Sequence, residues 1–537
     1  MGLVELNGSN TALDKMKNIV VVGAGAAGYF TAAALKRNIP NVNVTILYDP
    51  AVPMIGVGEA LAWGAPAFMK KVLGLDDEEA WIKESESTYK FGLRVCGFDG
   101  IDTPYFLGGG MPPPAANKLL LDTEYDLFDL WMHLNAKDRL SELKIQPPKN
   151  PFNVYASESY WFNQFNTVPQ RYTSDRLLAD QSLYSYHVNA KNIGRVVHDR
   201  VGKPAGVIEI PIKVRDVVLN KDGSIDYLLL DDETKQYADL FIDCTGFSRI
   251  LVNKIPSFTF NEMDEYSNDT AIVGPYAYQD RSEVVNYTTA NAMDHGWHFS
   301  VPSVYRSGEG YIFNSRVTSD VDMLIDEYYK KTNKKSVDFK KISWTPGYYD
   351  KTFSGNCMLL GLSAGFVDPF DSNGFNTVLE QIRSIIRHLT PDTDFQFGWR
   401  DHFNKRCSER ITDIQLRIQG FMELAPKNNT EYWQRLKIAA KKHDVENELL
   451  KLFFDPARNP TSKLFVSNIG QAYNREGICH NILYYNLPAE FKTIDIDQFV
   501  EDMGLQFFNF NSLRNQERAR TAMPCADYYK QLFPDLK

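Results

Sequence analysis

Near the start of the chain, residues 17–28 read KNIVVVGAGAAG. The first half, Lys17–Val22, is an apolar and mostly β-branched run, which predicts a buried strand. Glycines at 23, 25 and 28 follow in the pattern G-x-G-x-x-G, and an alanine-rich helical pattern continues over Tyr29–Lys36. A second strand is predicted over Val42–Leu47. Strand, glycine turn, helix and strand in this order predict the opening of a doubly wound α/β fold.

The glycine turn is the first candidate binding site. Glycines in such a turn let backbone N–H groups approach a pyrophosphate at the positive end of a helix. We therefore expect a dinucleotide to contact Gly23, Gly25, Ala26, Ala27 and Gly28. A turn that only packs a strand tightly against a helix is the alternative. Asp49, after the second strand, either reaches the adenosine ribose or serves a turn at Asp49-Pro50.

Composition argues against several classes of protein. The chain has 537 residues and a formal net charge of −10, so it lacks the basic surface that nucleic-acid binding requires. It has no uninterrupted apolar run of about 18 residues, so no transmembrane helix is expected. Six cysteines are scattered without CxxC spacing, which predicts neither a metal site nor a thiol redox motif. A reduced, cytoplasmic location is expected.

Three parts are predicted along the chain. Residues 1–16 form a loose extension, because they lack the apolar segment with basic flanks of a signal peptide. Residues 17–392 form the core, with a hairpin turn at 221–223 and a long helix that starts near Phe375. Residues 393–537 show a largely amphipathic helical pattern and are expected to complete the substrate site.

Four further motifs follow one another in a recognisable order. They are Gly56-Val57-Gly58-Glu59-Ala60, Tyr186-His187-Val188-Asn189-Ala190, Ala238–Gly246 (ADLFIDCTG) and Gly361–Gly374 (GLSAGFVDPFDSNG). Together they resemble the motifs of the flavin-dependent halogenases best known as tryptophan halogenases, over about residues 17–390. The resemblance implies an FAD-binding core like those of glutathione reductase and the aromatic hydroxylases, with mixed sheets and a largely helical C-terminal part.

The resemblance also implies a reaction. FADH2 from a separate flavin reductase and O2 would oxidise a halide (chloride, bromide or iodide) to hypohalous acid, which halogenates an electron-rich aromatic substrate. Residues 17–392 would then hold the FAD, halide and lysine sites. Gly56, Gly58 and Asp368 would join the FAD contacts. The preferred halide and the choice between monomer and homo-oligomer stay open.

Four residues match the catalytic positions of the family. Lys90 matches the lysine that positions hypohalous acid or carries the halogen as a haloamine; the alternative is a surface lysine on an amphipathic helix. Asp371 takes the place of a glutamate that polarises the hypohalite or accepts a proton; the alternative is a helix N-cap. Asn373 and Gly374 match the pair whose backbone amides lie near the halide.

Trp297 and Phe299 replace two family tryptophans, and Pro302 closes the same segment. In the family this bulky pair separates the flavin from the substrate; a buried core strand is the alternative. The loop 105–114 has glycines and prolines where the family has a histidine and aromatic contacts. We therefore expect a substrate other than free tryptophan: another indole, a phenol or a pyrrole.

Two other interpretations stay open. A single-component FAD aromatic hydroxylase would share the glycine turn, but such enzymes usually have Gly-Asp where this chain has Gly361-Leu362. A non-catalytic flavin-binding protein would accommodate Tyr48 and Phe299, but it gives no reason for Lys90 and Asp371.

Overall fold

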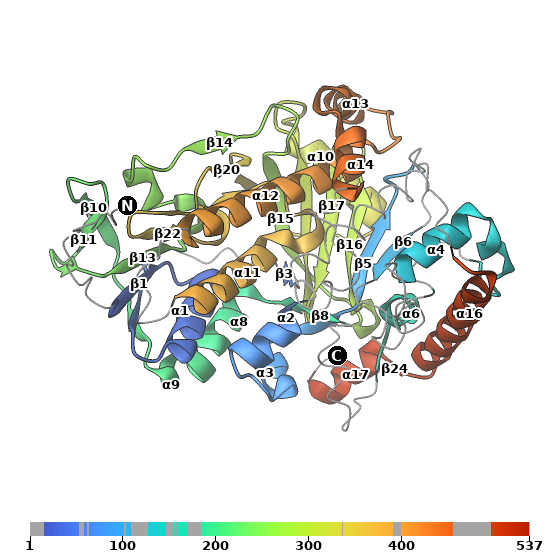
Figure 1. The fold of residues 1–537 in the computed structure, drawn as a ribbon, viewed down its shortest axis with the longest axis horizontal. Helices are drawn as coiled ribbons and strands as arrows, with labels where there is room; N and C mark the ends of the chain where they lie inside the picture. Colours follow the sequence, from blue (N-terminus) through green and yellow to red (C-terminus); the bar gives the residue numbers. More distant parts are fainter. Residues whose placement is uncertain are drawn as a thin grey trace, which may run out of the picture.

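A computed structural model describes most of the chain (Figure 1). The described residues are 16–52, 58–61, 64–100, 104–108, 127–146, 155, 158–169, 184–335, 337–389, 399–454 and 496–535. Within these ranges the chain forms two large sheets that lie side by side, with helices packed around them (Figure 1).

The predicted strand-turn-helix opening lies at the centre of a six-stranded sheet. β1 pairs in parallel with β2 on one side and with β13 on the other. The strands, in spatial order, are β21 (Phe353–Ser354), β22 (Cys357–Leu359), β13 (Leu240–Asp243), β1 (Asn18–Val22), β2 (Asn43–Leu47) and β9 (Ile208–Ile210). The predicted doubly wound α/β fold is confirmed.

Both faces of this sheet are covered. Ile19 and Val21 pack with helix α1 (Ala26–Asn38), whereas Val20 and Val22 pack with the hairpin strands β10 (Val214–Leu219) and β11 (Ile225–Leu230). The hairpin turns at the predicted residues 221–223 and continues into β12 (Lys235–Gln236). Burial on both faces explains why β1 is a continuous apolar run and does not alternate.

The second large sheet has seven strands and carries the predicted barrier segment. Its strands, in spatial order, are β19 (Lys340–Ser343), β15 (Thr270–Ala277), β18 (Arg306–Phe313), β17 (Trp297–Pro302), β16 (Tyr287–Ala292), β5 (Gly92–Cys96) and β6 (Tyr105–Gly108). β5 and β16 are parallel, and the other neighbours are antiparallel. Helix α10 (Val321–Thr332) covers one face, and α12 (Trp399–Glu423) with α13 (Glu431–His443) covers the other.

Smaller sheets accompany the two large ones. They comprise β3 (Glu59–Ala60), β8 (Ser185–Val188) and β4 (Thr88–Lys90); β14 (Phe260–Glu262), β20 (Gly347–Tyr349) and β23 (Gly365–Phe366); and β7 (Thr167–Val168) with β24 (Met523–Pro524). Because β24 pairs with β7, the end of the chain returns to the first third of the sequence (Figure 1).

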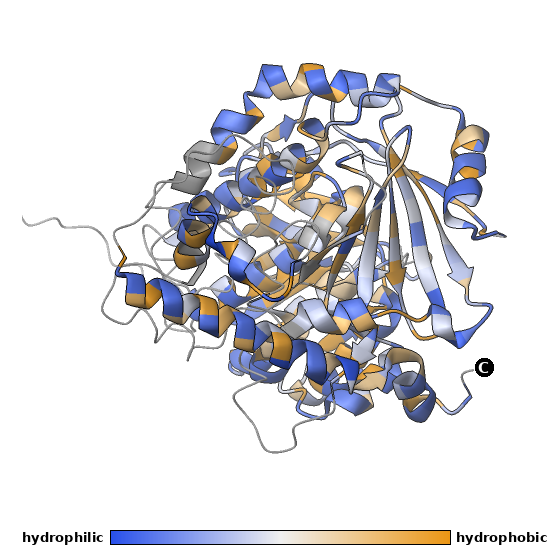
Figure 2. Cartoon of the chain, turned by 90° about the vertical axis from the view of Figure 1, so that its right-hand side faces the viewer, coloured by the Kyte–Doolittle hydropathy of each residue, from blue (hydrophilic) through white to orange (hydrophobic). Residues whose placement is uncertain are grey.

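The described residues form further helices. The helices are α2 (Ala65–Ala67), α3 (Glu78–Ser85), α4 (Leu127–Ala136), α6 (Glu158–Phe165), α8 (Ala190–Val197), α9 (Lys203–Ala205), α11 (Asn373–His388), α14 (Val445–Phe454), α16 (Gln498–Arg520) and α17 (Cys525–Leu532). The outer helices carry hydrophilic residues interspersed with hydrophobic ones (Figure 2). Among the described helices, none combines the length and apolar character that a membrane span needs.

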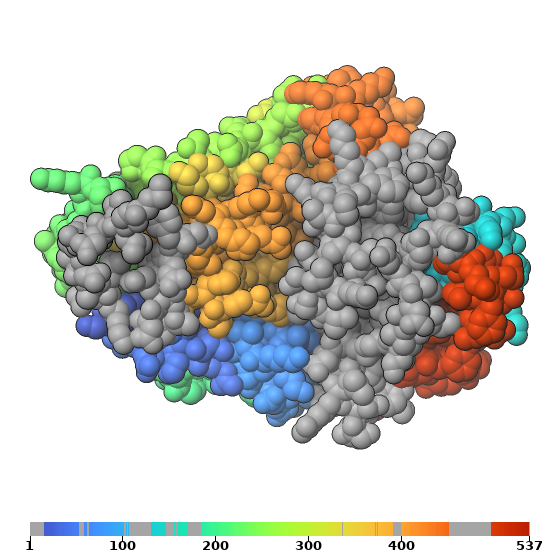
Figure 3. Space-filling view, viewed as in Figure 1, coloured from blue at the N-terminus to red at the C-terminus, as the bar shows by residue number. Residues whose placement is uncertain are grey.

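Helix α11 connects the nucleotide-binding sheet with the C-terminal helices. It begins two residues before the predicted Phe375 and packs between α1 and α12. The yellow and orange surface of α11 and α12 adjoins the blue N-terminal segments in Figure 3. The start of α11 is therefore held from both sides, which matters because the predicted catalytic and halide residues lie there.

A buried carboxylate anchors the α10 face of the seven-stranded sheet. Glu309 of β18 is fully buried. It accepts hydrogen bonds from His298 (2.7 Å), Ser300 (2.7 Å), Ser307, Tyr328 (3.0 Å) and Lys334 (2.6 Å). Burial by itself would raise the pKa of Glu309, but the hydrogen bond and charge of His298, together with Lys334, outweigh it and hold the pKa at about 2.

We expect Glu309→Ala to lower the free energy of unfolding by about 3–5 kcal/mol, because it leaves the buried His298 and the half-buried Lys334 without their carboxylate partner. Urea denaturation at neutral pH measures the loss, and Glu262→Ala, at an exposed position of β14, is the control. Since the folded pKa is about 2 and the ordinary value is 4.5, the stabilisation is present above about pH 4.5 and disappears as the pH falls toward 2. A loss no larger than that of the control would contradict the anchoring role.

Candidate active site

The glycine turn has the geometry of a phosphate cradle. A Cβ on Gly28 would lie 1.8 Å from the carbonyl oxygen of Gly23, and a Cβ on Gly23 would lie 2.4 Å from that of Cys244. These two glycines are therefore required by the packing of β1, α1 and β13. Gly25 differs, because a Cβ there would meet no atom within 4 Å. Gly25 is also the N-cap of α1 and has no side chain to cap the helix, so the first N–H groups can receive a pyrophosphate.

The strand that ends beside this turn is fixed by its own carboxylate. Asp243, at the end of β13, accepts hydrogen bonds from the backbone N–H groups of Thr245 (2.9 Å), Leu251 (2.9 Å) and Val252 (3.1 Å). The Ser363 hydroxyl donates to the Asp243 carbonyl oxygen, which brings the segment after Gly361 against the same turn. The two glycine-containing motifs are thus adjacent, as one dinucleotide site requires.

The other predicted FAD residues differ in the contacts that the structure shows for them. Asp49 accepts the Ala51 N–H at 2.9 Å, which is the turn role; its contact with a ribose stays a prediction. A Cβ on Gly58, where φ is +122°, would lie 3.5 Å from Val301 of β17, so Gly58 adjoins the barrier strand. Gly56 and the loop residues 109–114 lie outside the described residues.

Lys90 is buried on strand β4, with 4% of its surface exposed. The alternative of a surface lysine on an amphipathic helix is therefore wrong: helix α3 ends at Ser85, and the chain passes through Glu86 at a φ of 55° before β4 begins. The Lys90 Nζ donates a hydrogen bond to Ser372 Oγ at 3.1 Å. Ser372 was not among the predicted site residues, although it stands between Asp371 and Asn373 in the same motif.

Hydroxyl groups tie the lysine strand to the end of the barrier strand. The Thr88 hydroxyl donates to the Pro302 carbonyl oxygen at 3.2 Å and also lies 3.1 Å from His187 Nδ1. His187 Nε2 lies 3.0 Å from the Thr288 hydroxyl. Burial, with a smaller effect of the Lys90 charge, holds the pKa of His187 well below its ordinary value, so this imidazole is neutral. β4 and β17 are therefore fixed relative to each other.

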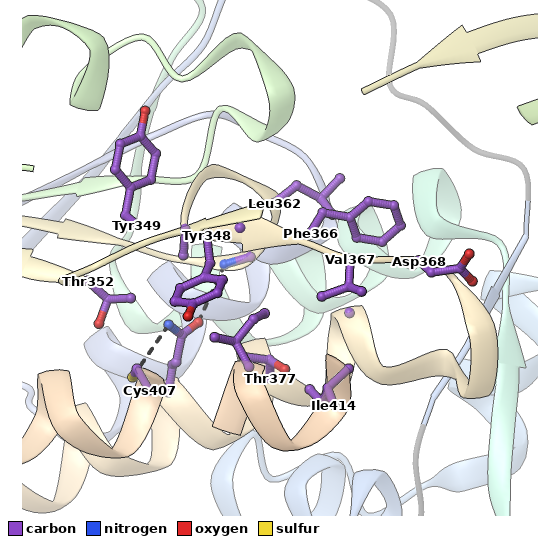
Figure 4. Close-up of a pocket in the computed structure, with 16 residues that line it drawn as sticks. Tyr348, Tyr349, Thr352, Leu362, Phe366, Val367, Asp368, Thr377, Cys407 and Ile414 are labelled. Carbon is purple, nitrogen blue, oxygen red and sulfur yellow. Dashed lines mark hydrogen bonds between the residues drawn. The ribbon is translucent and has the colours of Figure 1, made fainter. Parts of the chain in front are cut away.

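The start of α11 faces a pocket. A turn over Phe370–Ser372 leads into α11, and Ser372, with φ at +59°, is the N-cap. The cap position predicted for Asp371 is thus one residue too early. Gly374 lines a pocket that encloses about 580 Å³, part of it open to solvent, together with Phe366 of β23 and Ile414 of α12 (Figure 4). The side chains of Asp371 and Asn373 are outside the described part of the structure, and their roles stay predictions.

Two of the predicted barrier residues, Trp297 and Phe299, share one face of β17. Trp297 is buried, and its ring centroid lies 5.9 Å from that of Phe299. Phe299 is paired across the sheet with Gly310, and a Cβ on Gly310 would lie only 2.2 Å from the phenyl ring. Glycine at that position therefore makes room for Phe299. Asp368, predicted as an FAD contact, lies beside Trp297, with its Oδ2 3.4 Å from the indole nitrogen.

The chain has the doubly wound α/β fold of FAD-binding enzymes, and the structure brings the buried Lys90 to the start of α11. A family model described as tryptophan halogenase matches residues 18–472. The chain therefore belongs to the tryptophan halogenase family, and it is a flavin-dependent halogenase of aromatic substrates.

Individual relatives agree with this assignment. The chain is 24% identical to tryptophan 7-halogenase RebH of Lentzea aerocolonigenes over 490 aligned residues. This alignment covers 89% of this chain and 87% of that protein. It is 25% identical over 432 residues to tryptophan 6-halogenase ThaL of Streptomyces albogriseolus, covering 79% of each. A crystal structure of a tryptophan halogenase from Shewanella frigidimarina has a TM-score of 0.82 at 18% identity, covering 97% of this chain and 98% of that one. The prediction of a halogenase is confirmed.

The two kinds of glycine in the cradle give a test of the FAD site. We expect Gly25→Ala to fold normally, because its methyl group meets no protein atom, but to bind FAD at least about tenfold more weakly by blocking the pyrophosphate. Gly28→Ala should instead disturb the fold, because its Cβ clashes with backbone.

Circular dichroism and a flavin fluorescence titration separate these effects. Wild-type FAD affinity in a well-folded Gly25→Ala protein would show that the pyrophosphate lies elsewhere.

Proposed function

We propose that the chain is the halogenase component of a two-component system in the cytoplasm, supplied with FADH2 by a separate flavin reductase. Its substrate is a small electron-rich aromatic compound, namely an indole, a phenol or a pyrrole. The observation that carries the proposal is the hydrogen bond between buried Lys90 and Ser372, which places an amine at the start of the helix that holds Gly374.

The residues present fit the implied cofactor. Gly25 and the first turn of α1 would hold the pyrophosphate, and the segment Gly361–Gly365 would lie along the flavin side of the site. Bound reduced FAD supplies one chemistry, the O2-dependent oxidation of halide to hypohalous acid. The backbone N–H groups at the start of α11 would attract the halide, because a helix N-terminus carries partial positive charge.

Lys90 would present the halogen to the ring. An amine in this position donates a hydrogen bond to the hypohalous oxygen, or it exchanges one N–H hydrogen for the halogen as the O–halogen bond breaks and water leaves. In either case an electrophilic halogen is held at one place. Ser372 orients the Nζ, and burial of β4 keeps bulk water from competing for the reagent. Asp371, one residue before Ser372, would accept the proton that the substituted ring releases.

The barrier pair would divide the two steps. Trp297 and Phe299 present bulk on one face of β17, while Pro302 at its end is bonded to the lysine strand through Thr88. A separation of this kind lets a small oxidised halide reach Lys90 while it keeps the organic substrate away from the flavin.

We expect Lys90→Ala to lose at least about a thousandfold of halogenation activity while FAD still binds, because the group that holds the halogen is removed. The assay supplies FAD, a flavin reductase, NADH and a panel of phenols and indoles in separate chloride, bromide and iodide buffers, with mass spectrometry of the products. Lys437→Ala is the control: Lys437 is a half-buried lysine whose pKa desolvation lowers to about 8, but it belongs to α13.

Full activity of Lys90→Ala would refute the role of the lysine. Oxygenated products without halogen from the wild-type protein would favour the aromatic hydroxylase instead.

Ser372→Ala should slow halogenation by about 10- to 100-fold, the effect of removing one hydrogen bond to an amine that must be oriented. Ser372→Thr keeps the hydroxyl group and should recover part of the rate. Steady-state kinetics with the best substrate of the panel measure both variants. If Ser372→Ala were as fast as wild type, the hydrogen bond would have no part in the reaction.

A further inference from the structure

The indole N–H of Trp297 is directed at a buried carboxylate. It donates to Asp368 Oδ2 over a long distance, 3.4 Å. The same carboxylate accepts the side-chain amide of Asn268 at 2.9 Å and the backbone N–H of Phe370 at 2.9 Å. Asp368 is 5% exposed, and Trp297 is 2% exposed. A carboxylate at this depth needs several donors, so it holds these donors in place as much as they stabilise it.

Ring contacts fix the same indole in a second direction. The Phe370 ring meets Trp297 edge-on, with centroids 5.2 Å apart and planes at 78°. Phe370 packs in turn against Phe421 of α12, at 4.9 Å. Because the Phe370 N–H is bound by Asp368, one carboxylate positions both the indole and the ring on which the indole rests. Loss of that carboxylate would release both.

Hydrogen bonds continue from Asp368 into the C-terminal helices. The Tyr432 hydroxyl, near the start of α13, donates to Asn268 Oδ1 at 3.1 Å, and the Asn268 amide donates onward to Asp368. Tyr432 and Asn268 are both buried. The chain of contacts runs from α13 to β17 through side chains that are closed to solvent, where a hydrogen bond is not replaced by water.

We propose that Asp368 is a positioning residue for the barrier tryptophan, and that Asn268 and Tyr432 link this barrier to the C-terminal helices. This proposal rests on the proposed function, in which Trp297 separates the flavin from the aromatic substrate. If the Trp297 indole can rotate about its side-chain bonds, the flavin and the aromatic substrate are no longer kept apart. Oxidising equivalents are then consumed without forming a halogenated product. In this role Asp368 acts through Trp297, whereas its contact with FAD stays a prediction.

Fluorine NMR on full-length protein labelled with fluorotryptophan tests the positioning directly. The sequence has 8 tryptophans, and Trp297→Phe identifies the Trp297 resonance by its disappearance. Asp368→Ala should shift or broaden this resonance strongly. Asp368→Asn, which keeps an acceptor oxygen, should have a smaller effect. Tyr432→Phe removes only the far hydroxyl group and should move the same resonance slightly.

A single-turnover assay gives the functional consequence. FAD-loaded protein is reduced and mixed with O2, bromide and a phenol, and the halogenated product per flavin is measured by mass spectrometry. Asp368→Ala should lower this yield about tenfold, the effect of one lost charged hydrogen bond, without a change in FAD affinity. Glu423→Gln is the control, because this buried carboxylate of α12 pairs with His443 and not with Trp297.

The two measurements separate the possible outcomes. An unchanged Trp297 resonance in Asp368→Ala, or loss of FAD binding with that resonance in place, would overturn the inference. A shifted resonance in a protein whose wild type halogenates no probe would support the positioning role and remove the proposed function. If Asp368→Ala does not fold, Asp368→Asn and Tyr432→Phe decide the question, because each keeps the size of the side chain.

Discussion

A lysine amine inside a protein must find hydrogen-bond acceptors, and this requirement governs how the site is assembled. Lys90 reaches Ser372, which lies 282 residues further along the chain. The contact forms only if the small sheet β3-β8-β4 meets the start of α11, and α11 is itself held between α1 and α12. The proposed active site therefore depends on how the small sheet β3-β8-β4 meets helix α11.

The barrier strand β17 has a buried carboxylate on each face. Glu309 binds His298 and Ser300 on the α10 side, whereas Asp368 binds Trp297 on the α12 side. Their electrostatic surroundings differ. The pKa of Glu309 is held at about 2 by cationic partners, but burial raises the pKa of Asp368 to about 6 because its donors are neutral. Glu309 stabilises the sheet, whereas Asp368 orients a single side chain on it, that of Trp297.

The sequence predicted those elements that depend mainly on neighbouring residues in the chain. β-Branched runs gave β1 and β2, the turn residues at 221–223 gave a hairpin, and α11 begins within two residues of its predicted start. Lys90 shows the limit of such patterns. A strand of three residues is too short to display alternation, and β4 exists because it pairs with β8, about a hundred residues away. The sequence motif was enough to identify Lys90. The burial of Lys90 and its hydrogen bond to Ser372 could be read only from the folded structure.

The motifs that identify the family end near residue 390, yet the C-terminal helices reach the site at two points. The backbone N–H of Tyr89, next to Lys90, donates to the Tyr529 hydroxyl of α17 at 2.6 Å. Tyr432 of α13 reaches the barrier through Asn268. Both links are buried phenol contacts made across long sequence separations, which short motifs do not record. The C-terminal region therefore does more than cover the core: it fixes the strand of the lysine and, through Asp368, the orientation of the barrier.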